Sequence, residues 1–483
     1  MQNSYQKFAK DVFIIGLANA AVSLSGIIFM PLITKTLGAY EYGIWAQVQV
    51  TIGLFIAFTG LGLLAAMARF LPVKTDRAEI QEEFYSVFSL VFLAALVAAA
   101  ILIAAAGPIA AAFFDGATAV VRITGLIVLV WSLDNVFLAL FRAFRQMKRY
   151  ALFTVATTYA QVGLIAYLVL NGHGIVSIVL AMLAIKAVIF IVLFCLVKSQ
   201  IGIGRPQFSR IRDYLSFGLP TIPTGMSAWV IASSDRYVIG YFLGAASVGI
   251  YSAGYGLGKL MLMPVGVLGF VLPPALSRLY DEDRTEEVRT YLSYSLKYSL
   301  ALAIPFVFGA AVLAEPVLGV FSTAGIAEAG YLVVPLVALS ALLLAAYSPI
   351  AQILVLVKKT RISAAIWIIC ALVNLGLNIV LVPRWGILGA AFTTLLAYGL
   401  ALGVTSYYCF KEFRFPIDWR FIAKSLVSSV VMSVAIWATA PEGLSATLRT
   451  VVTGVAIYGA GLLLLKGFSK EEFRFFKGLF QRS

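Results

Sequence analysis

The chain has 483 residues, of which 61% are hydrophobic and only 12% carry a charge. This balance is far more apolar than that of a soluble globular domain, and it excludes that class of protein. The 36 Lys and Arg residues outnumber the 22 Asp and Glu residues, which gives a formal net charge of +14. Long apolar runs follow one another from end to end, so we expect an all-α integral membrane protein.

A helix needs about 20 apolar residues to cross roughly 30 Å of hydrocarbon. Fourteen runs of this kind are present, and each is predicted to form one transmembrane helix. They lie, in chain order, near 11–33, 44–66, 86–106, 119–141, 151–170, 174–197, 213–234, 249–276, 291–313, 331–356, 363–382, 386–408, 421–440 and 449–466. The first run continues through Ile33 without the short, bounded core of a cleaved signal, so we expect it to be retained. Pro220 and Pro223 interrupt the seventh run.

The distribution of positive charge predicts the orientation. If the N-terminus is cytoplasmic, the segments on that side hold most of the Lys and Arg residues, Arg142 among them. The outer ends of the spans keep only Lys35, Arg122, Arg236, Arg384 and Arg449. Because positively charged loops stay on the cytoplasmic side, we expect a multi-pass protein of the cell membrane with both termini cytoplasmic. Insertion topology and anionic lipid headgroups explain this positive face better than nucleic-acid binding does.

Residue types that carry catalysis are scarce. His173 is the only histidine, and Cys195, Cys370 and Cys409 lie in or beside apolar runs without metal-ligand spacing. The longest outer connection, roughly from Ala314 to Gly330, is too short to fold as a domain. We therefore expect no catalytic residue, no metal and no cofactor, and a protein that is not an enzyme.

One short phrase occurs twice in the chain. Residues 37–46 read LGAYEYGIWA after span 1, and residues 243–252 read LGAASVGIYS after span 7. A second pair, GHGI at 172–175 and RWGI at 384–387, begins spans 6 and 12. Six spans separate the copies, so the repeat is parallel and its two halves are predicted to be related by an axis along the membrane normal.

The repeat predicts the organisation of the chain. It comprises an N-lobe at 1–200 (spans 1 to 6), a cytoplasmic linker at 201–212, a C-lobe at 213–410 (spans 7 to 12), and two extra helices with a basic cytoplasmic tail at 411–483. The repeated glycines suit turns that need a positive φ or close helix approach. We therefore interpret the phrase as architecture and not as a ligand site.

Four stretches resemble the polysaccharide transporter family: LGAYEYGIWA at 37–46, RFLP at 69–72, SSDRYVIGYFLGAASVGIYSAGYGLGKL at 233–260, and NLGLNIVLVPRWGILGAAFTTLLAYG at 374–399. These are the Wzx-type flippases, or polysaccharide biosynthesis proteins, of the multidrug/oligosaccharidyl-lipid/polysaccharide exporter superfamily. The resemblance extends over nearly the whole chain and implies a V-shaped transporter with a central cavity. It also implies that the protein moves a polyprenyl-diphosphate-linked oligosaccharide from the inner to the outer leaflet by alternating access. The implied partners are this lipid-linked oligosaccharide, membrane lipid, a polysaccharide polymerase and glycosyltransferases.

A diphosphate and its sugars cannot cross hydrocarbon without groups that replace their water. Lys186 lies about 12 residues into span 6 and Lys259 about 10 into span 8, which places both near the midplane. An ionisable group at that depth costs at least about 2.5 kcal/mol and should face the bundle interior or a wet cavity. We therefore expect Lys259, Lys186 and Arg236, the last at the outer end of span 7, to line the cavity and bind the diphosphate.

Other roles for these residues stay open. Lys186 has the alternative of an ion pair with Asp134 of span 4, and Arg236 of an interfacial ion pair with Asp235. Asp134 is also the candidate for coupling transport to a proton or sodium gradient. Uncharged polar residues within the spans suit a sugar-lined cavity as a group. They are Gln47, Gln49, Asn135, Gln161, Gln352, Asn374 and Asn378.

Two other functions remain open. A multidrug exporter of the same superfamily would place an acidic residue inside span 1, whereas Asp11 lies only at the start of that span. A non-transporting membrane scaffold of a polysaccharide assembly complex is equally compatible with this pattern of spans.

Overall fold

The computed structural model describes residues 2–468 and 472, with side-chain surroundings for all of these except 2–13, 264 and 267–271. The side chain of Asp11 and most of the predicted basic tail therefore lie outside what is described. Within the described part, the chain forms α-helices and short 3-10 turns and no strand. The all-helical fold predicted from the apolar runs is confirmed.

The helical elements, in chain order, are α1 (Gln2–Thr59), α2 (Leu63–Phe70), η1 (Leu71–Val73), α3 (Arg77–Ala104), α4 (Ala106–Phe113), α5 (Thr118–Ala143), α6 (Met147–Leu170), α7 (Ile175–Ile201), η2 (Phe208–Arg210), α8 (Ile211–Gly218), η3 (Leu219–Thr221), α9 (Ile222–Gly258), η4 (Lys259–Met261), α10 (Leu262–Asp281), α11 (Thr285–Phe321), α12 (Ala324–Gly330), α13 (Val333–Leu356), α14 (Thr360–Glu412), α15 (Trp419–Trp437) and α16 (Gly443–Leu464).

Glycine breaks explain how these elements relate to the predicted spans. In the described part, 11 helical segments are long and apolar enough to cross a membrane. Three of them, at 14–59, 208–261 and 360–412, are about twice the length of one crossing. Each contains a glycine whose backbone is not helical: Gly38 (φ 83°), Gly244 (φ 79°) and Gly386 (φ 60°). Gly38 and Gly386 thus each separate two predicted spans within one segment, and Gly244 separates span 7 from the start of span 8. Span 8, predicted as one run at 249–276, is interrupted at η4 and continues in α10.

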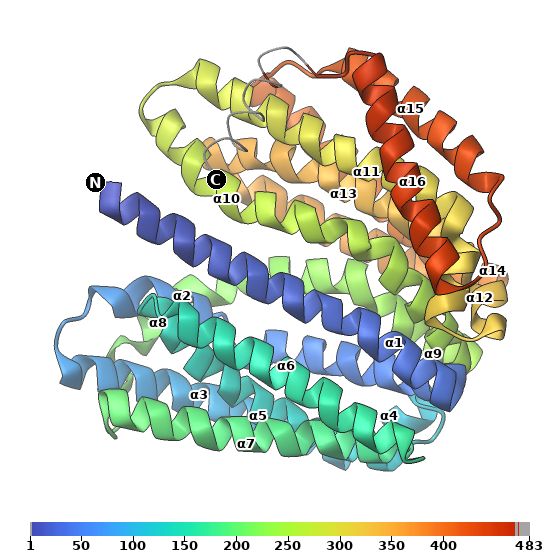
Figure 1. Cartoon of the computed structure of the whole chain (residues 1–483). Helices are drawn as coiled ribbons and strands as arrows, with labels where there is room; N and C mark the ends of the chain where they lie inside the picture. The colour runs from blue at the N-terminus through green and yellow to red at the C-terminus, as the bar shows by residue number, and fades with distance from the viewer. Residues whose placement is uncertain (1, 469–471, 473–483) are drawn as a thin grey trace. The chain divides into compact units, whose positions relative to one another are not determined.

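Packing divides the chain into two compact units. Unit 1 comprises residues 1–252 and 367–390, and unit 2 comprises 253–366 and 391–483. In unit 1, α5 packs between α3 and α7, while α1 packs against α5 and α6 (Figure 1). In unit 2, α11 packs against α13, α15 and α16. The lobe boundaries inferred from the repeat stay a prediction.

Unit 1 contains two apolar cores. One is built around fully buried aliphatic side chains such as Val48, Val128 and Ile178. The other is aromatic, and its Phe84 and Phe137 rings lie 6.1 Å apart. In lipid, van der Waals packing holds helices together because burial of apolar surface gives no gain over the acyl chains. Close fit therefore matters more here than apolar area.

The repeated phrase brings its two copies into contact within unit 1. A Cβ atom added to Gly43 would lie 1.7 Å from the carbonyl oxygen of Ala245, and one added to Gly249 would lie 2.0 Å from the carbonyl oxygen of Ala39. The contact is reciprocal, since the second glycine of each copy faces the alanine of the other. Only glycine permits backbones to approach so closely. This agrees with the interpretation of the phrase as architecture.

Candidate functional site

A polar pocket of about 460 Å³ lies within unit 1, among α1, α5, α6 and α7. It is lined by Val22, Ser25, Gly26, Phe29, Tyr42, Trp45, Gln49, Trp131, Asp134, Asn135, Leu138, Arg142, Tyr150, Phe153, Thr154, Thr157, Thr158, Gln161, Lys186 and Ile189. Arg142 lies in the last turn of α5 and Lys186 near the middle of α7. The pocket therefore reaches from the predicted cytoplasmic end of these helices to their middle.

Helical periodicity places the polar side chains on this pocket. One face of α5 carries Trp131, Asp134, Asn135, Leu138 and Arg142, which stand at positions i, i+3, i+4, i+7 and i+11. This stripe is readable in the sequence, yet only Asp134 and Asn135 were singled out there. Arg142 was assigned to the cytoplasmic loop charge, and Trp131 was missed.

The α6 wall presents a second stripe, at Tyr150, Thr154, Thr157, Thr158 and Gln161. Each of the three threonine hydroxyls donates to a carbonyl four residues earlier in its own helix, at 2.6 to 2.9 Å. Such a hydroxyl keeps its oxygen lone pairs as acceptors. This wall therefore offers acceptors to a guest that carries O–H or N–H groups.

Lys186 and Asp134 are brought together in the pocket. The Nζ of Lys186 lies 4.0 Å from Oδ2 of Asp134, and both side chains are buried. The ammonium group also lies 3.8 Å from the centre of the Trp131 ring, within the range of a cation–π contact. The ion pair considered as the alternative for Lys186 is thus present, and Lys186 lines the pocket as well.

Several buried polar atoms of this pocket lack hydrogen bonds. Among the described residues, neither carboxylate oxygen of Asp134 has a hydrogen-bond partner, and the same holds for Nε2 of Gln161. An unsatisfied buried polar group costs roughly 1–3 kcal/mol, and more when it is charged. The pocket is therefore better suited to a polar guest than to an apolar one.

Arg236 lies elsewhere in unit 1 and does not line this pocket. On α9, its Nη1 donates to Oδ1 of Asp235 at 2.7 Å, and Gln47 donates to its backbone carbonyl at 2.8 Å. The Tyr251 hydroxyl donates to the other carboxylate oxygen of Asp235. Asp235 and Arg236 are both buried. The ion pair considered for Arg236 is therefore present, as part of a buried network.

Lys259 belongs to unit 2, where it is the first residue of η4 and is exposed. Its ammonium group lies 5.8 Å from the centre of the Tyr255 ring. Its neighbours Leu257, Leu260 and Met261 line a second pocket of about 460 Å³, between η4, α11, α13, α15 and α16. The walls of this second pocket are almost wholly apolar. Whether Lys259 contributes to a site with Lys186 stays a prediction.

Both the sequence and the fold of this chain resemble those of known proteins. Residues 32–327 match the family described as "Polysaccharide biosynthesis protein". The chain is 21% identical over 236 residues to the "Probable low-salt glycan biosynthesis flippase Agl15" of Haloferax volcanii, covering 49% of this chain and 50% of that protein. It is 25% identical over 245 residues to the "Probable flippase AglR" of the same organism, covering 49% and 51%. The chain thus spans about half the length of the curated relatives it matches.

Solved structures resemble the fold over more of the chain. Lipid II flippase MurJ in an inward closed conformation superposes with a TM-score of 0.74 and 18% identity, covering 93% of this chain and 98% of that one. A multidrug resistance MATE family transporter of the MOP superfamily in an inward-facing conformation gives 0.69 and 16%, covering 80% and 93%. These likenesses show the fold alone. Because the matched family model extends over more than half of the sequence, this chain belongs to the polysaccharide biosynthesis protein family.

Proposed function

We propose that this protein is a flippase that moves a lipid-linked oligosaccharide from the inner to the outer leaflet by alternating access. The observation that carries the proposal is the polar pocket of unit 1, which combines cations, hydroxyl acceptors and aromatic rings inside a membrane-spanning bundle. Relatives named as flippases support the reaction class. A cell-membrane location, cytoplasmic termini, and contact with a polymerase and glycosyltransferases belong to the same proposal.

The charge of the pocket favours an anionic guest. Its charged lining residues are Arg142, Lys186 and Asp134, which leaves an excess of one positive charge. In a poorly screened site, a charge-assisted contact from Lys186 or Arg142 to a diphosphate is stronger than it is in water. The threonine stripe of α6 and the amide of Gln161 suit sugar hydroxyls. Tyr42 and Trp45 add rigid apolar surface beside these polar groups.

The apolar pocket of unit 2, taken by itself, suits an isoprenoid chain. Leu313, Val317, Met432 and Val455 are among its lining residues, and the Tyr458 hydroxyl is engaged in a hydrogen bond that it donates to the Ala301 carbonyl at 2.8 Å. A groove whose walls hold no polar group that needs a hydrogen bond accepts an isoprenoid chain at no desolvation cost. In this proposal Lys259 and Arg236 add positive potential along the path.

Asp134 is the proposed coupling residue. Its buried carboxylate faces Lys186 without a hydrogen bond among the described residues, so a proton or a sodium ion at this position would change the charge next to the cation. Transport measured in vesicles with the proton gradient, the sodium gradient and the membrane potential collapsed one at a time would identify the coupling. Insensitivity to all three would contradict a coupling role for Asp134.

Export of surface polysaccharide in the source organism tests the function. Lys186→Gln should lose most export at normal membrane abundance, and Lys186→Arg should keep part of it because the charge is retained. The matched control is Lys198→Gln, which removes an exposed lysine from the same helix. Full export by Lys186→Gln at normal abundance would contradict the assignment of Lys186 to the site.

A further inference from the structure

Helix α8 is a short segment with a backbone break on each side. Before it, Gly202 has a φ of 84° and a stretch without regular structure leads to η2. After it, η3 contains Pro220, which has no N–H for a helical hydrogen bond. The eight residues of α8 therefore join α9 through a turn that can bend, and they are not a rigid extension of it.

The backbone of α8 lies directly against α2 within unit 1. A Cβ atom added to Gly62 would lie 2.2 Å from the carbonyl oxygen of Gly218, and Gly62 itself has a φ of 67°. The ring of Phe70 lies 5.2 Å from that of Tyr214 and 5.7 Å from that of Phe217. One face of α2 thus carries the contact.

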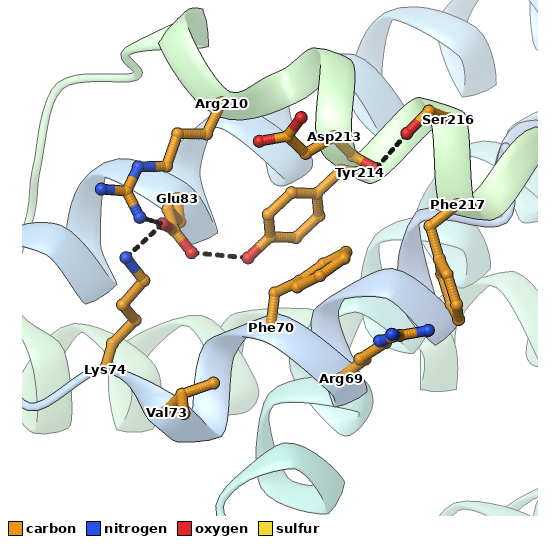
Figure 2. A pocket seen from close by; sticks show the side chains of 10 residues that line it. All are labelled: Arg69, Phe70, Val73, Lys74, Glu83, Arg210, Asp213, Tyr214, Ser216 and Phe217. Atoms are coloured by element: carbon orange, nitrogen blue, oxygen red, sulfur yellow. Dashed lines mark hydrogen bonds and ion pairs between the residues drawn. The ribbon is translucent and has the colours of Figure 1, made fainter.

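Buried Glu83 on α3 connects these elements (Figure 2). The Tyr214 hydroxyl of α8 donates to Oε2 of Glu83 at 2.6 Å. Oε1 of Glu83 lies 3.2 Å from Nζ of Lys74 and 3.6 Å from Nη1 of Arg210. The hydrogen bonds that Lys74 donates to the Glu79 and Glu83 carboxylates raise the pKa of Lys74, so it stays charged at physiological pH. We call Glu83, Lys74, Arg210 and Tyr214 the Glu83 cluster.

The contact combines aromatic packing with a polar cluster, since Tyr214 is 2% exposed and belongs to the aromatic core of unit 1, against which Phe70 and Phe217 pack. The Glu83 cluster and its neighbours surround a pocket of about 500 Å³. The attraction within a buried ion pair is largely offset by the cost of removing its charges from water. When α8 moves away, water can hydrate Glu83 and Arg210, so the ionic part of the contact adds little to the free-energy cost of separation. A polar, cavity-containing contact beside a bend is the kind of element that has two arrangements.

We propose that α8 is a latch: the Glu83 cluster holds it against α2 and α3 in one conformation and releases it, about the bend at η3, in another. Lys74 and Arg210 belong to the Lys- and Arg-rich segments that are predicted to be cytoplasmic, so we place the latch on that side of the membrane. The proposal goes beyond the proposed function because it applies whatever molecule is carried. It assigns Glu83 a positioning role, through Tyr214 and Arg210, and no contact with a substrate.

A buried reporter thiol tests the latch. Ala66 lies one turn before Phe70 on α2, is 0% exposed, and belongs to the same buried core as Tyr214 of α8. Ala66→Cys is made in a full-length chain whose three native cysteines are replaced, and its reaction with a maleimide is timed in nanodiscs. Glu83→Gln should speed labelling by about ten-fold or more, as expected on losing a charge-assisted contact. The control Glu79→Gln removes the other carboxylate near Lys74, and labelling should change by less than about two-fold.

A second reporter distinguishes local release from general unfolding. Ala110 on α4 is also 0% exposed and lies in the other core of unit 1, so Ala110→Cys should stay unlabelled in the Glu83→Gln variant. Tyr214→Phe, which removes only the hydroxyl that Glu83 accepts from, should speed labelling at position 66 even if Glu83→Gln fails to insert. Equal rates at position 66 in the parent and both variants would overturn the latch. Faster labelling at both reporters would also overturn it, since Glu83 would then stabilise the whole unit.

Discussion

The reciprocal glycine contact gives a prediction whose size follows from the structure. In Gly43→Ala, the new methyl group starts 1.7 Å from the Ala245 carbonyl oxygen, and real Cβ atoms essentially never come closer than 3.0 Å to such an atom. The obstacle is backbone, which cannot turn aside as a flexible side chain can. Overpacking of this kind typically costs about 1–3 kcal/mol, and we expect the upper end of that range.

The helix propensity of alanine opposes this cost only in part. Replacing a helical glycine by alanine gains roughly 0.5–1 kcal/mol, so the net loss expected for Gly43→Ala is about 2 kcal/mol. Gly16→Ala is the matched control, because that position on α1 is helical and has no atom within 4 Å of the added methyl group. At about 2–4 °C for each kcal/mol, Gly43→Ala should lower the apparent melting temperature by about 4 °C or more, and Gly16→Ala should not lower it.

A double variant tests the reciprocity. Gly249→Ala should cost about as much as Gly43→Ala, since its methyl group would meet the Ala39 carbonyl oxygen at 2.0 Å. Once one added methyl group has moved the two copies of the phrase apart, the second methyl group fits between them at little further cost. The two together should therefore cost less than the sum of the single changes. A melting temperature for Gly43→Ala equal to that of Gly16→Ala would refute the reasoning.

Three further predictions concern other parts of the chain. A reporter that is active only outside the cytoplasm should be silent when fused after Ser483, and strong activity there would contradict the predicted orientation. Lys259→Gln should lose most export while Lys259→Arg keeps part of it; unchanged export by Lys259→Gln at normal abundance would remove that residue from the site. Buried Lys297 lies 3.0 Å from Glu472, so Lys297→Gln should destabilise the protein by about 3–5 kcal/mol and lower its melting temperature. Lys359→Gln, which breaks an exposed ion pair, should cost only about 0–1 kcal/mol, and equal effects would contradict the argument.

Local pattern was sufficient to predict the helices and their breaks. Apolar runs of membrane-spanning length correspond to the helical segments, and the glycines of the repeated phrase lie where α1 and α9 break, at Gly38 and Gly244. These features depend on residues near one another in the chain. The contact of Gly43 with Ala245 depends on tertiary packing, so the sequence indicated a turn and not its partner.

The sequence predicted residues of the candidate site only where the depth of a side chain in the membrane was enough to pair it with another. Lys186 and Asp134 were paired from their similar depth, and they lie 4.0 Å apart. Arg142 was assigned to a loop because it stands at the end of an apolar run, although its helical spacing from Asp134 places it in the pocket. Glu83 gave no signal, since its partner Tyr214 is 131 residues away and follows a break.

Reconstitution tests the central claim most directly. The purified full-length protein is placed in liposomes with a polyprenyl-diphosphate-linked oligosaccharide, and the glycan that becomes accessible to an impermeant reagent is followed over time. The account predicts faster exposure with the parent protein and with Lys198→Gln than with empty liposomes, and little acceleration with Lys186→Gln. Exposure with the parent protein at the rate of empty liposomes, in the presence of every gradient tested, would contradict the proposal that this protein is a flippase for such lipids.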